Sequence, residues 1–325
     1  MTVVSAGLLG VVVSQKQVGE WTPVSLPPLH WVSLILGLAP LMGAQLMLGG
    51  PHAALRVQAW LRARSRSLLV VVVSISALFL ISGLLVGRFD PYATVIFVSG
   101  TFVALGTLNA IEKGRRGLTW ADAAIWLLLW IPFDLRWNYD VWFGVAGFGY
   151  AWWGSAITVL AVLGWYGARD LPGFGYRLVP KWRDLAIALI AFVILAAIGI
   201  PIGLAVGFLS FPPRTVISLG AVLGAVINSF FFTAIPEELF FRGLLLHGLD
   251  QMYRRHRLNL LLSSLAFGLM HWNNSTGLEA QIAHVSLATL MGVLAGWTYR
   301  RSGNKLISPV LFHVFVGITF HMMKL

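Results

Sequence analysis

The 325-residue chain contains no cysteine and few charged residues, and each shortage excludes some classes of protein. Without cysteine the chain can form no disulfide and no site in which thiolates hold a metal. Charged residues make up 11% of the chain, whereas soluble domains carry about 25%. Hydrophobic residues make up 58%, and the mean hydropathy is +0.81. These values are typical of a protein whose helices face lipid along most of its length.

Acidic residues are scarcer than basic ones, and the formal net charge is +11. Nucleic-acid binding is not favoured, because bases and aromatic residues are not interleaved in the way that stacks nucleotides. The bases instead gather in short connections between apolar segments, as orientation by cytoplasmic Lys and Arg predicts. We therefore expect no nucleic-acid partner. The first 14 residues lack a basic region, so we expect no cleaved signal peptide there.

The apolar segments predict an all-α, polytopic transmembrane bundle of about ten spans. A helix that crosses the hydrocarbon core needs about 20 apolar residues. Basic residues follow every odd-numbered segment, which places these connections in the cytoplasm and both termini outside. The predicted spans lie at about 29–48, 67–86, 91–111, 118–133, 150–167, 185–208, 216–249, 258–271, 280–299 and 306–323.

Polar residues are unevenly distributed along these segments. The seventh segment carries three charges, Glu237, Glu238 and Arg242, and six of the eight histidines follow residue 246. Placing an ionisable group at bilayer depth costs free energy unless the group is paired with another charge, in contact with water or part of a functional site. We therefore expect transmembrane helices of unclear role at residues 1–213 and a catalytic core in the four helices of residues 214–325.

The spacing of the charges indicates how they divide their roles. Glu238 and Arg242 are four residues apart, so they share one helix face and are expected to pair. Glu237 is rotated by about 100° from Glu238, which makes it a candidate general base. Pro236 removes a backbone donor and is expected to kink the helix just before the acids. The alternative is that all three charges form one buried network that only fixes helix packing.

Two histidines on later segments lie at comparable depth. Counting from the nearest cytoplasmic bases at 1.5 Å per residue places Glu237 roughly 25 Å, His271 roughly 21 Å and His313 roughly 12 Å or more into the membrane. A carboxylate and two imidazoles are enough to hold and activate water, or to hold a metal. Each histidine taken singly is equally consistent with an interhelical hydrogen bond.

Three short motifs follow one another on these hydrophobic helices: EExxxR at Glu237, Glu238 and Arg242, FxxxH at Phe267 and His271, and His313 after Pro309. In this order they resemble the CAAX protease and bacteriocin-processing family of intramembrane endopeptidases (CPBP, also called Abi or type II CAAX prenyl proteases). The resemblance covers about residues 216–325. It implies hydrolysis of a peptide bond in a membrane-associated protein or peptide, with a prenylated CAAX-type substrate as one candidate.

The resemblance also implies roles for individual residues. Glu237 activates the water, His271 assists it, and His313 stabilises the oxyanion, with Glu238 and Arg242 completing the catalytic set. For the lining of the substrate site, the further candidates are Phe267, Asn228, His284 and His321.

One position departs from the family pattern. The family places an Asn or Asp four residues after the last histidine as a second oxyanion donor, but this chain has Gly317 there. His321, one turn beyond Gly317, is a candidate substitute. The alternative is that His321 is a histidine near the membrane interface with no role.

Two other functions fit parts of the pattern. Gly317 also suits a catalytically weak or inactive family member that acts as a membrane scaffold or bacteriocin-immunity-type factor. A transporter could use Glu237 and the histidines as a proton relay, although the two halves show no repeat of broken helices.

A carboxylate with two histidines is a plausible zinc set by residue type. The HExxH spacing is absent and the residues come from three helices, so we expect no metal and no cofactor. The sequence thus predicts a metal-independent glutamic endopeptidase that is a multi-pass protein of a bacterial cell membrane. Its expected partners are membrane lipid and a peptide or lipidated protein substrate, and its oligomeric state is left open.

Overall fold

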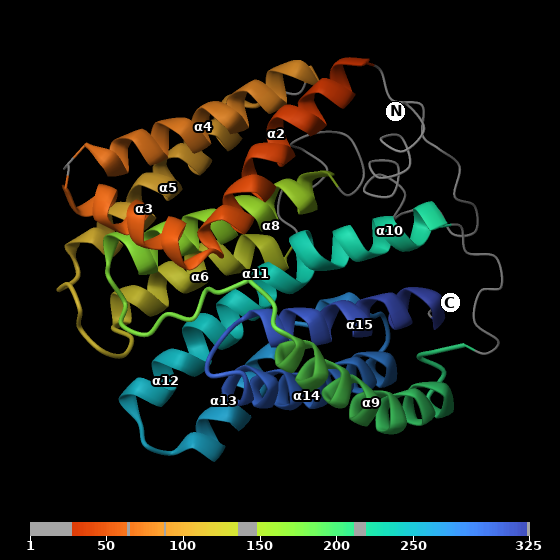
Figure 1. The fold of residues 1–325 in the computed structure, drawn as a ribbon. Coiled ribbons are helices and arrows are strands. Elements are labelled where there is room, and N and C mark those ends of the chain that lie inside the picture. Colours follow the sequence, from red (N-terminus) through yellow and green to blue (C-terminus); the bar gives the residue numbers. More distant parts are fainter. Residues whose placement is uncertain (1–27, 64–65, 88, 136–147, 211–218, 324–325) are drawn as a thin grey trace. The chain divides into compact units, whose positions relative to one another are not determined.

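The computed structural model describes residues 28–63, 66–87, 89–135, 148–210 and 219–323 (Figure 1). These residues form helices joined by turns, with no β-strand among them, so the all-α prediction is confirmed. The first 14 residues, where we expect no signal peptide, lie outside the described part. Contacts divide the chain into two compact units, one ending at Phe174 and one beginning at Gly175. The functional division between residues 213 and 214 stays a prediction.

The N-terminal unit contains the first five segments predicted as spans, and all five are helical. The connection after the first segment is also helical: α3 buries Ala54 and Leu61 and exposes most of its polar residues. The acidic residue in the first turn of α6 is compensated, because Asp122 forms a fully buried ion pair with Arg169 at 2.6 Å. The elements are α2 (Pro28–Leu48), α3 (Pro51–Ala63), α4 (Ser67–Leu85), α5 (Pro91–Ala110), α6 (Trp120–Asp134), α8 (Phe148–Ala161) and the π-helix η1 (Val162–Ala168).

The C-terminal unit contains the other five predicted segments, which are again helical. The seventh segment is one helical stretch that alternates between α- and π-helical winding. The elements are α9 (Trp182–Ala205), α10 (Leu219–Ile227), η2 (Asn228–Ala234), α11 (Ile235–Glu238), η3 (Leu239–Leu246), α12 (His247–Met252), α13 (His256–Leu269), the short 3-10 helix η4 (Trp272–Asn274), α14 (Leu278–Arg301) and α15 (Ile307–Met323).

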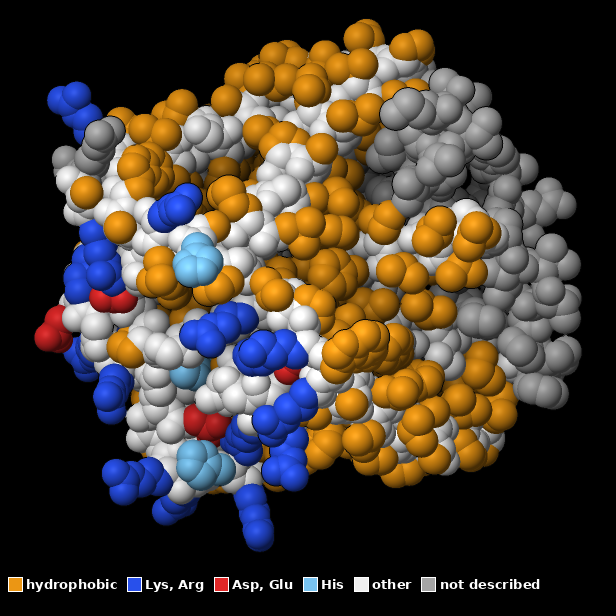
Figure 2. Space-filling view, viewed as in Figure 1, with side chains coloured by type: hydrophobic (Ala, Val, Ile, Leu, Met, Phe, Trp, Pro, Cys, Tyr) orange, Lys and Arg blue, Asp and Glu red, His pale blue; other side chains and the backbone are white. Residues whose placement is uncertain are grey.

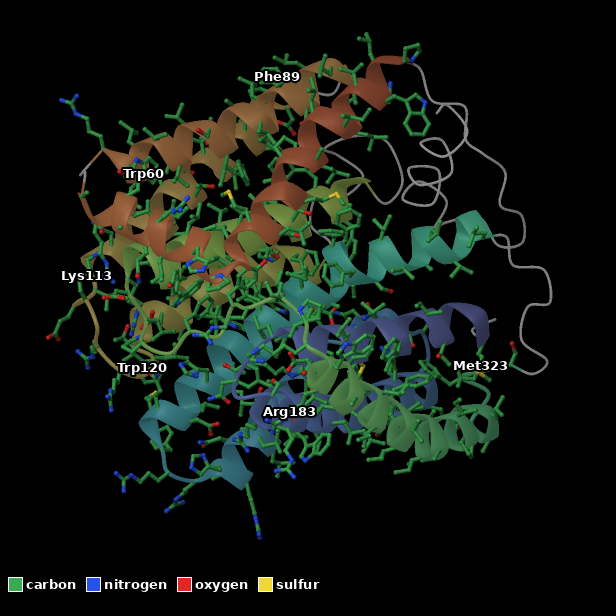
Figure 3. All side chains as sticks on the ribbon, in the orientation of Figure 1. Trp60, Phe89, Lys113, Trp120, Arg183 and Met323 are labelled. Carbon is green, nitrogen blue, oxygen red and sulfur yellow. The ribbon has the colours of Figure 1, made fainter. Side chains whose placement is uncertain are left out.

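Polar contacts at the two ends of the C-terminal unit show the directions of its helices. At one end Asp250 of α12 pairs with Arg300 of α14 at 2.8 Å, and Asp184 of α9 pairs with Lys305, just before α15, at 3.3 Å. At the other end the backbone N–H of Ser210 donates to the carbonyl of Met323 at 2.8 Å. Figure 3 shows Arg183 of α9 and Met323 of α15 at these opposite ends. Thus α9 and α15 run in the same direction, and α14 runs against them.

Apolar surface covers the flanks of the helices. Among the described residues, six helices are long and apolar enough to cross a membrane, including α9, α14 and the stretch Val222–Met252. Along α9 the exposed side chains include Leu189, Val193 and Ile198, and Figure 2 shows this flank as a hydrophobic surface, with Lys and Arg side chains gathered at the end where α12 meets α13. The chain is therefore an integral membrane protein. The count of ten spans and the bacterial origin stay predictions.

Helices α13 and α14 approach closely because two glycines lie at their contact. A Cβ at Gly268 would be 2.8 Å from the carbonyl oxygen of Val285 and closer still to Thr289 Oγ1, and a Cβ at Gly292 would be 3.0 Å from Ser264 Cα. A methyl group at either glycine therefore forces the two backbones apart.

We predict that Gly268→Ala destabilises the protein by about 1–3 kcal/mol, the usual cost of overpacking. Thermal unfolding of purified protein in detergent measures the change. The matched control is Gly106→Ala on α5, where a Cβ meets no atom within 4 Å, and where alanine should raise helix stability. Equal unfolding temperatures for the two variants would contradict the predicted role of Gly268.

Candidate active site

The two acids lie in the middle of the helical stretch from Leu219 to Met252. The π-helix η2 ends at Ala234, and α11 begins at Ile235, directly before Pro236. Proline has no N–H to donate to the preceding turn, and π-helical turns inside α-helices are frequent at functional sites. Segments of π-helix flank α11 on both sides, and the kink expected at Pro236 stays a prediction. Both acids are buried, with Glu237 8% and Glu238 0% exposed.

The pair expected from the spacing of Glu238 and Arg242 is present. Glu238 Oε2 lies 3.1 Å from Arg242 Nη1. The same guanidinium donates from Nη2 to the carbonyl of Gly292 on α14 at 3.2 Å, and its carbon lies 4.3 Å from the ring centre of Phe267 on α13. Arg242 therefore links three helices. The sequence could not indicate Gly292, because every residue has a carbonyl and only the tertiary packing selects this one.

His313 of α15 bridges the two acids. Its Nδ1 donates a hydrogen bond to Glu238 Oε1 at 2.9 Å, and its Nε2 lies 3.7 Å from Glu237 Oε2. A carboxylate can only accept, so the proton of this hydrogen bond belongs to Nδ1. The contact between His313 and Glu238 was not predicted, since the sequence assigned Glu238 to Arg242 alone.

Phe267 lies between the two histidines. Its ring centre is 4.7 Å from that of His271 and 6.2 Å from that of His313, to which it is perpendicular. His271 follows the end of α13, and its Nδ1 donates to the carbonyl of Phe267 at 2.9 Å. A carbonyl can only accept, so Nε2 of a neutral His271 is left as the hydrogen-bond acceptor.

His284 of α14 adjoins this group. Its ring centre lies 5.3 Å from that of His271, and its Nδ1 shares a hydrogen bond of 2.9 Å with Ser275 Oγ. Phe208 covers it from the turn after α9, with ring centres 4.9 Å apart. The contacts therefore run from Glu238 through His313, Phe267 and His271 to His284.

Asn228, predicted for the substrate site, is half-buried at the start of η2. Among the described residues no hydrogen bond, ion pair or ring contact joins it to the acids or histidines. The side chain of His321 lies outside the part that the structure describes. Across the described residues no group of three or more His, Asp or Glu side chains has the arrangement of a metal site. The catalytic and substrate-binding roles all stay predictions.

The site contains a carboxylate that can accept a proton, Glu237, and an imidazole that can donate a hydrogen bond, His313. Glu237 and Glu238 lie next to each other on one helix, and Arg242 and His313 hold Glu238 from two directions. Such a site can take a proton from water and can stabilise a negatively charged oxygen.

Comparison with known proteins gives a match over the part of the chain that contains these residues. Residues 218–319 match the family model described as type II CAAX prenyl endopeptidase Rce1-like, and all of Glu237, Glu238, Arg242, His271 and His313 fall within the match. No curated protein and no solved structure shows significant similarity to the chain. The C-terminal part of this chain therefore carries a domain of the CAAX protease family of membrane endopeptidases.

Proposed function

We propose that this domain hydrolyses a peptide bond within the membrane, with Glu237 as the base that activates water. The observation that carries the proposal is the bridge made by His313, which lies 2.9 Å from Glu238 and 3.7 Å from Glu237. One nitrogen of this imidazole, Nδ1, is hydrogen-bonded to Glu238. The other, Nε2, lies beside Glu237, the proposed base. A water and a substrate carbonyl brought to this point meet an acceptor and a donor at once.

The reaction proceeds through a tetrahedral intermediate. Glu237 takes a proton from water while the water oxygen bonds to the carbonyl carbon, and the carbonyl electron pair moves onto oxygen. His313 donates from Nε2 to this oxyanion. The intermediate then collapses, the carbon–nitrogen bond breaks, and the leaving amine receives the proton that Glu237 had taken. Glu237 thus ends the cycle as a carboxylate.

Glu238 and Arg242 act as positioning residues for His313. Glu238 Oε1 lies 2.9 Å from His313 Nδ1, and this hydrogen bond holds the imidazole so that Nε2 lies beside Glu237. Arg242 holds Glu238 in turn. His271 assists by accepting a hydrogen bond from the attacking water at Nε2.

The substrate class follows from the family match and from the apolar surroundings. We take it to be a membrane-associated protein or peptide, with a prenylated CAAX-type C-terminus as the first candidate. The match to a family described as prenyl endopeptidases supports this choice, and a lipid anchor would hold the scissile bond at the membrane.

The test uses purified protein in vesicles with two peptides that end in a CAAX sequence, one farnesylated and one not. We expect cleavage of the farnesylated peptide, and one heavy oxygen in the new carboxylate when the water is enriched in it. We also expect no loss of rate with 1,10-phenanthroline, because no proposed step uses a metal. Mass spectrometry of the products provides the measurement. Failure to cleave either peptide would contradict this substrate class, and inhibition by the chelator would contradict the mechanism.

A further inference from the structure

Gly317 lies one turn after His313 on α15, and the side chain of Ser229 from η2 fills the space beside it. A Cβ at position 317 would lie 3.3 Å from Ser229 Cβ and much closer to Ser229 Oγ. Any residue other than glycine would therefore place its Cβ against the hydroxyl group, and the Ser229 side chain would have to shift. Glycine inside a helix costs about 1 kcal/mol relative to alanine. In α15 this destabilising residue lies at the position where the hydroxyl group of Ser229 approaches the helix.

The winding of η2 brings Ser229 onto the face of the helix that carries Glu237. The two residues are eight positions apart, which in a uniform α-helix at about 100° per residue leaves them rotated by about 80°. Hydrogen bonds in a π-helix reach five residues instead of four, so η2 winds less per residue and reduces this offset. Both η2 and α11 contact α15. The geometry thus sets Ser229 opposite Gly317 and sets Glu237 opposite His313.

We propose that Ser229 is a further catalytic residue, whose hydroxyl donates a hydrogen bond to the same oxyanion as His313. The inference rests on the proposed function and adds the second donor. Residues four apart on a helix have Cβ atoms about 5–6 Å from each other, so a group beside Gly317 and the imidazole of His313 can flank one carbonyl oxygen. Ser229 forms no covalent bond and keeps its proton throughout the reaction.

This assignment also accounts for the departure at position 317. The donor that the resemblance expects on α15 is supplied from the facing helix instead, through a hydroxyl that needs a glycine opposite it. His321, the substitute considered from the sequence, lies two turns from His313, whereas Gly317 and the hydroxyl against it lie one turn away.

The activity test compares Ser229→Ala with Ser229→Thr on the farnesylated peptide in vesicles. Loss of one oxyanion donor lowers kcat by about 10²–10³-fold, so we expect a drop of that size in Ser229→Ala with KM nearly unchanged. Ser229→Thr keeps the hydroxyl and should retain most of the rate. Ser286→Ala, an exposed serine on α14, is the matched control and should behave as the unsubstituted chain.

A second pair of variants tests the packing without an activity assay. Gly317→Ser should lower the unfolding temperature, because its Cβ collides with Ser229. The combined variant Ser229→Gly with Gly317→Ser moves the hydroxyl onto α15 and should restore both stability and most of the activity. Equal unfolding temperatures for Gly317→Ser and the unsubstituted chain would overturn the contact on which the inference is built.

The outcomes separate this inference from the proposed function. If Ser229→Ala cleaves at the unsubstituted rate while Glu237→Gln does not cleave, Ser229 has no catalytic role and the proposed function stands. If His321→Ala loses activity and Ser229→Ala does not, the second donor is His321. If Glu237→Gln cleaves normally, the proposed function and the inference both fail.

Discussion

Glu237→Gln is expected to abolish detectable cleavage, with a loss on the order of 10²–10⁴-fold, the usual contribution of a general base. An amide has nearly the size of the carboxyl group it replaces but cannot take a proton from water. The fold should persist, because Glu237 does not contribute to the pairing of Glu238 with Arg242 at 3.1 Å. The rate is measured on the farnesylated peptide in vesicles, and the fold by thermal unfolding.

The matched control is Glu279→Gln, which removes an exposed carboxylate from the first turn of α14. This variant should cleave at the unsubstituted rate, so that a loss in Glu237→Gln cannot be attributed to net charge. Unchanged cleavage by a folded Glu237→Gln would refute the role of the acid. Retention of a biological effect without any cleavage would instead favour the scaffold or immunity-type function.

Arg242→Met is expected to have the largest effect on stability, a loss of about 3–5 kcal/mol. The guanidinium is 1% exposed and its partner Glu238 is 0% exposed, so its removal takes the arginine partner away from a buried carboxylate. The hydrogen bond to Gly292 and the contact with Phe267 are lost as well. Denaturant unfolding in micelles provides the free energy.

The double variant Glu238→Gln with Arg242→Met separates charge from packing. Replacing both members of a buried pair is often nearly neutral, whereas removing one is costly. We therefore expect the double variant to recover much of the loss. Arg183→Met, at an exposed position on α9, controls for the loss of one positive charge. An Arg242→Met variant as stable as the unsubstituted chain would show that the pair contributes little.

The sequence by itself determined where the helices lie and that the fold is all-α. A bilayer requires that backbone groups bond within each segment, so long apolar runs could only become helices, and the ten predicted segments are helical with ends close to those expected. The spacing of Glu238 and Arg242 likewise determined their pairing, because four residues on a helix return to the same face. The helix α3 was missed, because its polar residues resemble those of a loop.

The tertiary structure alone decided which groups of different helices meet. Counting residues placed Glu237 roughly 25 Å and His313 roughly 12 Å or more into the membrane, yet their side chains lie 3.7 Å apart, since a count along the chain contains neither the tilt of a helix nor how far it extends past its neighbours. The hydrogen bond from His313 to Glu238, the carbonyl of Gly292 under Arg242, and the hydroxyl of Ser229 against Gly317 depend on the same packing. Hydropathy and residue spacing predict the structure of a single segment. The site, however, forms between segments, where side-chain shape decides which groups come into contact.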